Sequence, residues 1–167
     1  MSSDPNFTEL AKKAYEIIGR GCFLNSAANG KINSMTIGWG TVGNVWRRPI
    51  FITMVRKSRY THELIEANPF FTVSIPYNKN MSKEIGVFGT LSGRDVNKFE
   101  KCGLLTKPAQ KVNVPIIANT GIQFECKVVY KQDMEPTLLN KNITKEFYGD
   151  NDYHTMYYGE ILSSYID

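Results

Sequence analysis

The stretch KINSMTIGWGTVGNVWRRPIFITMVRKSRYTHELIEANPFFTVSIP, residues 31–76, decides the fold, because short β-rich runs alternate in it with turn residues. A run of Thr, Val, Ile and Phe that is bounded by Gly, Pro or Asn is typical of a strand. Residues 60–67 instead have helical spacing and end at Asn68-Pro69, which predicts a short helix. The three strands expected in this stretch are residues 32–41, 50–56 and 70–76.

On the amino-terminal side of this stretch, apolar residues recur at three- and four-residue steps and predict a helix over residues 6–18. Asn29-Gly30 is a strong hairpin signal because both residues tolerate positive φ. It predicts that a strand over residues 22–27 pairs antiparallel with the strand over residues 32–41.

On the carboxyl-terminal side, Val96 and Phe99 predict a short helix that Asp95 caps and Gly103 ends. Six or more short strands with small helices predict a mainly β protein with peripheral helices, built as a barrel. The remaining expected elements are strands over residues 122–130 and 155–166 and a helical piece over residues 143–148.

The composition narrows the classes of function. The 167 residues include 20 Lys and Arg against 16 Asp and Glu, and a scattered net charge of +4 is a weak footprint for nucleic acid. This length suits one domain over residues 1–167. No apolar run is long enough to cross a bilayer, and residues 1–10 lack the apolar core of a signal peptide. We therefore expect a protein that is not inserted in a membrane.

The cysteines and histidines offer no metal or thiol chemistry. Cys22, Cys102 and Cys126 are widely spaced and contain no C-x-x-C pair, which favours a reducing, cytoplasmic location. His62 and His154 are far apart, with no grouping of carboxylates or thiolates around either. We therefore expect no metal site.

The densest polar motif is RKSRYT, residues 56–61, where a strand passes into a short helix. Backbone N–H groups at a helix start point outward, and the helix dipole adds partial positive charge. Arg56, Ser58, Arg59 and Thr61 add side-chain donors that can surround a phosphate. The alternative is a solvated loop in which Thr61 is an ordinary helix cap.

Upstream of this motif, Gly38 and Gly40 stand inside a run of strand-forming residues. A glycine in a strand often marks a bulge or a close approach to the backbone. A flat aromatic ligand could lie against the main chain there, and the freed main-chain groups could recognise the edge of a heterocycle. The alternative is a plain kink in the barrel.

With three later motifs, these two segments resemble the flavin reductase-like proteins, which include the flavoredoxins. The later motifs are GTLSGRDVNKFEKCGL at residues 89–104, FECKVV at 124–129 and HTMYYGEI at 154–161, all in the family's order. The matching blocks cover roughly residues 21–167, and the combination of motifs is more specific than any one of them. Cys22 stands where the family commonly has a small, alanine-like residue, which is a conservative departure.

The resemblance implies an FMN-binding split β-barrel, usually a homodimer, with non-covalent flavin near the subunit interface. It implies that Met35, Thr36, Ile37, Gly38 and Trp39 lie along the isoalloxazine ring. The ribityl phosphate would be held by Arg56, Ser58, Arg59 and Thr61. It also implies Lys98 as a further phosphate or flavin contact, and His154 near the ring system or the phosphate.

Without the resemblance, the residue patterns around Lys98, His154 and His62 predict ordinary surface positions and no ligand contact. Lys98 is expected to point away from the helix face that carries Val96 and Phe99, as a solvated lysine does. His154 follows acidic residues and is expected at the surface. His62, four residues before Glu66 on a helix, is expected to be a surface residue with a weak charge partner.

The expected function is that of an oxidoreductase in which FMN accepts a hydride from NADH or NADPH and passes electrons to free flavin or a redox protein. The cofactor supplies this chemistry, so no catalytic acid or base needs to be named. No G-x-G-x-x-G motif is present, and a nicotinamide nucleotide would bind only transiently over the flavin. The alternatives are a flavoredoxin-type electron carrier without its own nicotinamide reaction, and a flavin-binding or nucleic-acid-binding barrel without turnover.

The aromatic residues favour a homodimer. They exceed what one small barrel readily buries, and such residues are enriched at subunit interfaces. The alternative places them in the core and rim of a single barrel. The residues concerned are Trp39, Trp46, Tyr153, Tyr157, Tyr158 and Tyr165.

Overall fold

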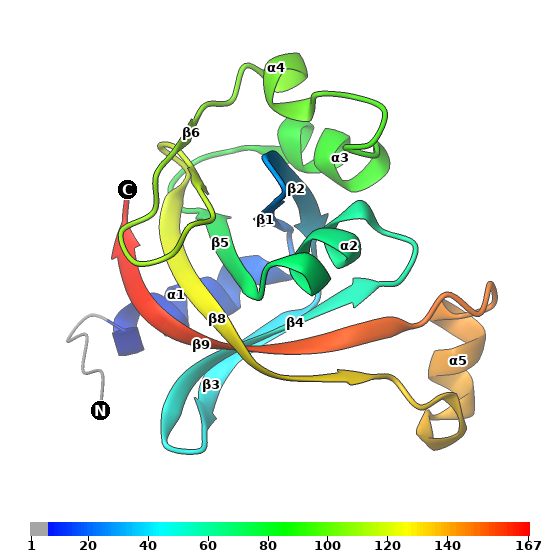
Figure 1. Cartoon of the computed structure of the whole chain (residues 1–167). Helices are drawn as coiled ribbons and strands as arrows, with labels where there is room; N and C mark the ends of the chain where they lie inside the picture. Colours follow the sequence, from blue (N-terminus) through cyan, green and yellow to red (C-terminus); the bar gives the residue numbers. More distant parts are fainter. Residues whose placement is uncertain (1–6) are drawn as a thin grey trace.

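The computed structural model describes residues 7–167, which form a curved sheet with small helices around it (Figure 1). The main sheet has the strand order β2-β1-β5-β8-β9-β4-β3, and every neighbouring pair is antiparallel. The expected class, mainly β with peripheral helices, is confirmed. The strands are β1 (Cys22–Ala28), β2 (Lys31–Ile37), β3 (Gly40–Val45), β4 (Arg48–Arg56), β5 (Phe70–Pro76), β8 (Gly121–Asp133) and β9 (His154–Ile166).

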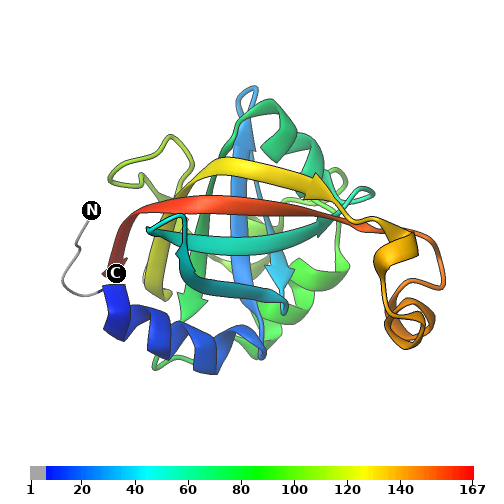
Figure 2. The same cartoon turned by 90° about the horizontal axis from the view of Figure 1, so that it is seen from below.

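One core lies inside the curve of the sheet. The ring of Phe51 packs against the rings of Phe71 and Phe124, with centroids 6.4 and 6.0 Å apart. Helix α1 (Phe7–Ile18) adds Leu10, Ala14 and Ile18, which its four-residue spacing places on one face, and it packs against β3, β5 and β9 (Figure 2). The expected start of this helix, at residue 6, lies outside the described residues.

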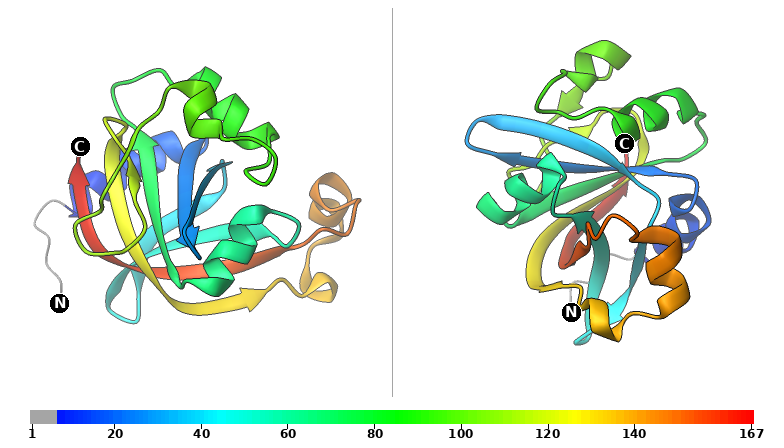
Figure 3. Two further views of the ribbon diagram at one scale, coloured as in Figure 1. Left: turned by 45° about the horizontal axis from the view of Figure 1, so that its top comes forward. Right: turned by 90° about the vertical axis from the view of Figure 1, so that its right-hand side faces the viewer.

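Three short helices gather near β1 and β2 (Figure 3): α2 (Tyr60–Ala67), α3 (Ser82–Thr90) and α4 (Lys98–Cys102). α2 has the bounds that the sequence predicts. α4 ends as expected at Gly103, which has a φ of 64°. The cap of α4 is Asn97, whose side chain accepts a hydrogen bond from the Glu100 N–H, so the prediction of an Asp95 cap is wrong. The helix begins too late in the chain for Asp95 to reach it.

The single strand expected over residues 32–41 is wrong, because the chain changes sheet edge within it. β2 ends at Ile37 and pairs with β1 at one edge, whereas β3 begins at Gly40 and pairs with β4 at the other edge. A Cβ on Gly40 would lie 3.1 Å from the Ile52 carbonyl oxygen, so the crossing needs a small residue there. Gly38 and Trp39 therefore connect the two edges of one nearly closed sheet.

Other elements depart from the expected pattern. The sequence did not predict α3, nor the two-stranded sheet of β6 (Thr106–Lys107) and β7 (Ile116–Ile117). The helical piece predicted over residues 143–148 is α5 (Lys141–Phe147), capped by Asn140. Within residues 7–167, no helix is long and apolar enough to span a membrane.

The chain between β8 and β9, residues 134–153, forms what we call the α5 segment, and it includes the 3-10 helix η1 (Pro136–Leu138). β8 and β9 carry it beyond the end of the barrel (Figures 1 and 2). Its last residues return to the barrel, where His154 opens β9 and pairs with Arg56, the last residue of β4. This pairing places the end of the α5 segment beside the β4–α2 junction.

Candidate functional site

Two adjoining cavities lie where β2, the β4–α2 junction and the loop between α3 and α4 meet. The larger, which we call the cationic cavity, measures about 430 Å³ and is lined by Arg56, Arg59, Arg94 and Lys98 among others. The smaller, which we call the slot, measures about 160 Å³ and follows the chain from Met35 to Trp39. Met35, Arg56 and Arg59 line both cavities, so the two adjoin.

Each residue that the sequence predicted for the site lines at least one of these cavities. The slot holds Met35, Thr36, Ile37, Gly38, Trp39, Arg56, Arg59 and His154. The cationic cavity holds Met35, Arg56, Ser58, Arg59, Thr61 and Lys98. The fold therefore brings together residues that lie up to 119 positions apart, from Met35 to His154 (154 − 35 = 119).

Lys98 lies in the cationic cavity with only 3% of its surface exposed, so the expected solvated lysine is wrong. The reason is α3, which packs against α4 and covers this face. Lys98 Nζ donates to the carbonyl oxygens of Leu91 and Phe88, at 3.2 and 3.5 Å. Burial, and then the charge of Arg59, lower the pKa of Lys98 to about 8. An anion in this cavity would relieve both effects.

Arg59 is the second cation here with only a carbonyl partner. Its Nη1 donates to the Gly89 carbonyl oxygen at 3.4 Å. Among residues 7–167, no carboxylate forms an ion pair with Arg59 or Lys98. Lys98 is buried and Arg59 is half-buried, and a cation removed from water without an acidic partner favours an anionic ligand.

Thr61 is buried beside Arg59, and its hydroxyl accepts a hydrogen bond of 2.9 Å from the Asn33 side-chain amide. The cap position of α2 is occupied by Arg59, with no side-chain cap bond, so Thr61 is not the helix cap of the alternative interpretation. The Asn33–Thr61 hydrogen bond instead joins β2 to the start of α2. Because both residues line the cationic cavity, the bond holds this part of its wall in place.

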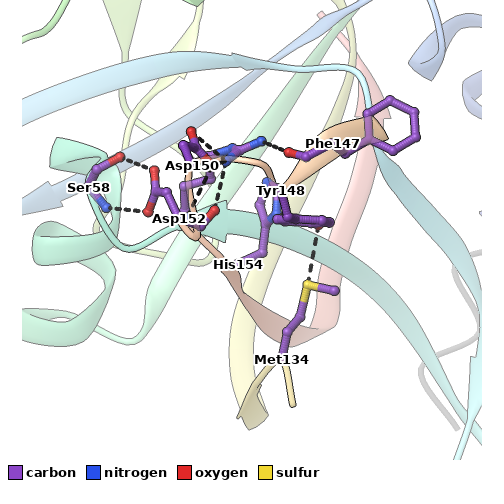
Figure 4. A network of polar contacts seen from close by, with 8 residues as sticks. Ser58, Met134, Phe147, Tyr148, Asp150, Asp152 and His154 are labelled. Atoms are coloured by element: carbon purple, nitrogen blue, oxygen red, sulfur yellow. Dashed lines mark hydrogen bonds and ion pairs between the residues drawn. The ribbon is translucent and has the colours of Figure 1, made fainter. Parts of the chain in front are cut away.

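Residues of the α5 segment accept the hydrogen bonds of Arg56 and Ser58, and Figure 4 shows Asp152 beside Ser58. Arg56 donates to the carbonyl oxygens of Asp152 and Phe147, each at 2.7 Å, and to the Asp150 carboxylate at 3.1 Å. Ser58 donates to the Asp152 carboxylate twice, from its hydroxyl at 2.5 Å and from its backbone N–H at 3.4 Å. Two of the predicted phosphate donors thus already have anionic partners.

The slot has one aromatic wall. The Trp39 ring is 42% exposed and meets the Phe147 ring edge-on, with centroids 5.0 Å apart. The ring of His154, the first residue of β9, has its centroid 5.4 Å from that of Trp39. A Cβ on Gly38 would meet no atom within 4 Å, so the backbone there faces open space. The Thr36 hydroxyl faces α3, where it donates to the Ile85 carbonyl oxygen at 2.6 Å.

His154 is 7% exposed, so the expected surface histidine is wrong. Its pairing with Arg56 in the β4–β9 ladder draws it inward. Burial, and then the charge of Arg56, lower the pKa of His154 to about 4, which leaves the ring neutral at pH 7. A hydrogen bond of 2.8 Å joins its Nδ1 to the Tyr148 hydroxyl, which also reaches Met134 Sδ at 3.3 Å. The other side of the imidazole is left for the slot.

Several residues of the site were not predicted from the sequence. Arg94 donates from Nη1 to the Ser58 carbonyl oxygen at 3.1 Å, and its guanidinium lies 5.1 Å from the centre of the Tyr60 ring. Gly93 packs so tightly that a Cβ would overlap the Asn33 side chain. The SGRDVNK motif contained this signal, since it places a glycine and an arginine just before Lys98.

His62 does not belong to either cavity. It is half-buried and so less exposed than expected, and its Nε2 lies 3.0 Å from the Thr155 hydroxyl oxygen. The expected weak charge partner is present, since the charge of His62 helps to lower the pKa of Glu66. In the described part of the chain, no group of three or more His, Cys, Asp or Glu side chains could hold a metal ion.

The site has cations at one end and a flat slot lined by backbone at the other, on a curved β sheet. These features define the class of protein as one that binds a ligand with an anionic end and a flat ring. The model of the family described as "Flavin reductase like domain" matches residues 18–167, and the chain belongs to this family. The resemblance drawn from the motifs is confirmed. An uncharacterized protein of Archaeoglobus fulgidus is 33% identical over 132 residues. The match covers 79% of this chain and spans 64% of the length of that relative.

Solved structures show the same fold. A flavoredoxin from Methanosarcina acetivorans is 27% identical, with a TM-score of 0.68 over 88% of this chain and 68% of that one. Flavoredoxin of Desulfovibrio vulgaris is 22% identical, with a TM-score of 0.69 over 88% and 69%. An FMN-binding domain of a flavin reductase-like enzyme from Shewanella baltica is 20% identical, with a TM-score of 0.67 over 94% and 74%. The fold is the split β-barrel.

Proposed function

We propose that this chain is an FMN-binding oxidoreductase that takes a hydride from NADH or NADPH and passes electrons to free flavin or to a redox protein. The observation that carries the proposal is the pair Arg59 and Lys98, two cations without a carboxylate partner, beside a slot that is open to the backbone at Gly38. This combination suits a ligand with an anionic end and a flat ring.

The residues present fit FMN. Arg59 and Lys98 would hold the phosphate, and the stretch from Met35 to Trp39 would lie along the ring. Bound FMN supplies the hydride and electron chemistry. The chain then has to anchor the phosphate, keep the neutral His154 imidazole beside the ring, and shield one side of the slot with Trp39.

Relatives support the class of activity. One structural neighbour is an NADH:FAD oxidoreductase of Streptomyces globisporus, at 19% identity, and another is component B of a nitrilotriacetate monooxygenase from Bacillus cereus, at 13% identity. The second candidate is an electron carrier without its own nicotinamide reaction. The Methanosarcina flavoredoxin, at 27% identity, favours it.

We further propose a cytoplasmic location, which three free thiols in the described chain would suit.

We also propose that the chain acts as a homodimer. Part of the aromatic argument is wrong, because Tyr157 is 1% exposed and belongs to the chain's own core. Trp46 remains 58% exposed, and its ring lies 6.1 Å from that of Tyr130 and 6.0 Å from that of Tyr158. A cluster of this kind favours a subunit interface. Light scattering should give twice the chain mass, and a monomer that keeps its FMN at every dilution would contradict the proposal.

The test of the function is a visible spectrum. Protein mixed with FMN at micromolar concentration is titrated without oxygen with NADH and, separately, with NADPH. Loss of the flavin absorbance with either donor, faster than for free FMN, supports the reductase. Bound FMN that neither donor bleaches supports the carrier instead. No binding of FMN, FAD or riboflavin in an equilibrium titration at micromolar concentration would contradict both.

A further inference from the structure

The cationic cavity contains an anion that belongs to the chain itself. Asp152, at the end of the α5 segment, receives hydrogen bonds from the hydroxyl and the backbone N–H of Ser58. Its own backbone carbonyl oxygen receives a third bond, from Arg56 Nη1. A carboxylate held by a hydroxyl and a backbone N–H, on a residue whose carbonyl oxygen is bound by a guanidinium, has surroundings that would also suit a phosphate.

The neighbouring carboxylate, Asp150, is held by other groups and is more exposed. Asp150 pairs with Arg56 at 3.1 Å and accepts the backbone N–H of Asp152 at 3.1 Å, and its side chain is 66% exposed. It forms no hydrogen bond with Ser58. Because solvent screens an exposed pair of this kind, Asp150 contributes little to the occupation of the site. The two acidic residues thus form a natural matched pair for comparison.

A phosphate dianion cannot use the Ser58 donors while Asp152 holds them. The donors would be shared, and the charges would repel each other at close distance. Arg59 and Lys98, which have no carboxylate partner and donate only to carbonyl oxygens, would receive the phosphate first. Full engagement then requires Asp152 to leave Ser58, and its return would expel the phosphate.

From this geometry we propose that Asp152 is an internal competitor of the flavin phosphate, so that FMN is an exchanging ligand of this protein and not a permanently held one. The inference rests on the proposed function, because it needs flavin to bind in these cavities. It adds that Asp152 sets the ratio between the affinities for FMN and for riboflavin. A flavin that leaves readily suits a protein that passes reduced flavin to an acceptor.

The test compares D152N with D150N in the full chain. The two Ser58 bonds reach different oxygens of the Asp152 carboxylate, so asparagine keeps an acceptor for one of them and removes the negative charge. FMN and riboflavin are titrated by flavin fluorescence, and FMN release is timed by stopped-flow dilution. We expect D152N to bind FMN about tenfold more tightly and release it more slowly, with riboflavin affinity unchanged. D150N should change FMN affinity by less than about threefold.

Inorganic phosphate is the second probe. It should displace FMN from the wild type, leave bound riboflavin in place, and bind D152N more tightly than the wild type. An unchanged or lower ratio of FMN to riboflavin affinity in D152N, with riboflavin still bound, would overturn this inference alone. If the wild type and both variants bind no flavin, the proposed function fails and the inference fails with it.

Discussion

Two clusters of charged residues flank α2, and they differ in how their charges are balanced. On one side lies the cationic cavity, where Arg59 and Lys98 donate hydrogen bonds only to carbonyl oxygens and Lys98 also lies over the Phe88 ring. On the other side lies a set of residues that we call the α2–β9 network. It consists of Lys57, His62, Glu66, Lys131, Asp133, Thr155 and Tyr157.

In the α2–β9 network every lysine has a carboxylate. Lys57 pairs with Asp133 and Lys131 with Glu66, each at 2.5 Å. The hydrogen bond from Lys57, and then that from Thr155, hold the pKa of Asp133 below its usual value. Burial raises the pKa of Glu66, but hydrogen bonds from Lys131 and Tyr157 outweigh it and leave the pKa lowered. Each lysine and each carboxylate of the network thus has its charged partner within the network.

The difference separates a structural cluster from a binding site. Charges that neutralise each other within the chain need no ligand, whereas buried cations without an acidic partner favour one. The cavity side also has paired charges, since Arg56 pairs with Asp150 and Arg94 with Glu63. The site is therefore identified by the two cations that have no acidic partner, and not by the number of charges.

The largest expected effect is on the cavity side, in R59A. Removing this guanidinium deletes a charge-assisted contact worth about 1.5–3 kcal/mol, so FMN affinity should fall about tenfold to a hundredfold. Riboflavin, which lacks the phosphate, should bind nearly as before. Fluorescence titration of both flavins measures the change, and an equal loss for both would place the phosphate contact elsewhere.

The second effect is a pH dependence that comes from Lys98. Its pKa of about 8 reflects burial first and then Arg59, with a small opposing effect from Cys102. Lys98 is charged below that pH and neutral above it, so FMN affinity should fall as pH rises through 8, by about tenfold between pH 7 and 9.5. The phosphate has a second pKa of about 6, so its charge changes little over this range.

The control for this prediction is K98Q, which should bind FMN weakly and with a flat pH profile between pH 7 and 9.5. Riboflavin affinity should not follow the same curve in either protein. An identical pH profile in K98Q and the wild type would mean that another group titrates.

A smaller effect is expected at the other end of the site, in W39A. Trp39 forms the aromatic wall of the slot beside Phe147 and His154. Loss of an aromatic contact is worth about 0.5–1.5 kcal/mol, so affinity should fall between about twofold and tenfold. The loss should be equal for FMN and riboflavin, which share the ring. A loss confined to FMN would move Trp39 to the phosphate end.

The smallest effect is expected in the α2–β9 network, in K131Q. Its pair with Glu66 lies partly in solvent, with Lys131 54% exposed, so the free energy of unfolding should change by about 0–1 kcal/mol. Affinity for both flavins should stay unchanged. Urea unfolding and the same titrations measure the two quantities, and a clear loss of flavin affinity would break the distinction between the clusters.

The sequence predicts best what is decided locally. α2 and β5 have the predicted bounds, since their limits are set by neighbouring residues such as Asn68, Pro69 and Pro76. The hairpin between β1 and β2 forms at Asn29 and Gly30, with φ values of 51° and 73°. The two motifs around Met35–Trp39 and Arg56–Thr61 also lie at the cavities, as their order along the chain indicated.

What could not be predicted depends on contacts between distant parts of the chain. Lys98 is buried by α3, and His154 is drawn inward by its pairing with Arg56. The occupation of Ser58 by Asp152 joins residues 94 positions apart. No local pattern reports such contacts, because the periodicity of a helix or strand does not say which other element covers its outer face.

The most direct test of the central claim needs no mutation. Wild-type protein is titrated with FMN and with riboflavin at pH 7, and the FMN titration is repeated in inorganic phosphate. If unpaired Arg59 and Lys98 hold the flavin phosphate, FMN binds more tightly than riboflavin and phosphate removes that advantage. Equal affinity for the two flavins, insensitive to phosphate, would contradict the account.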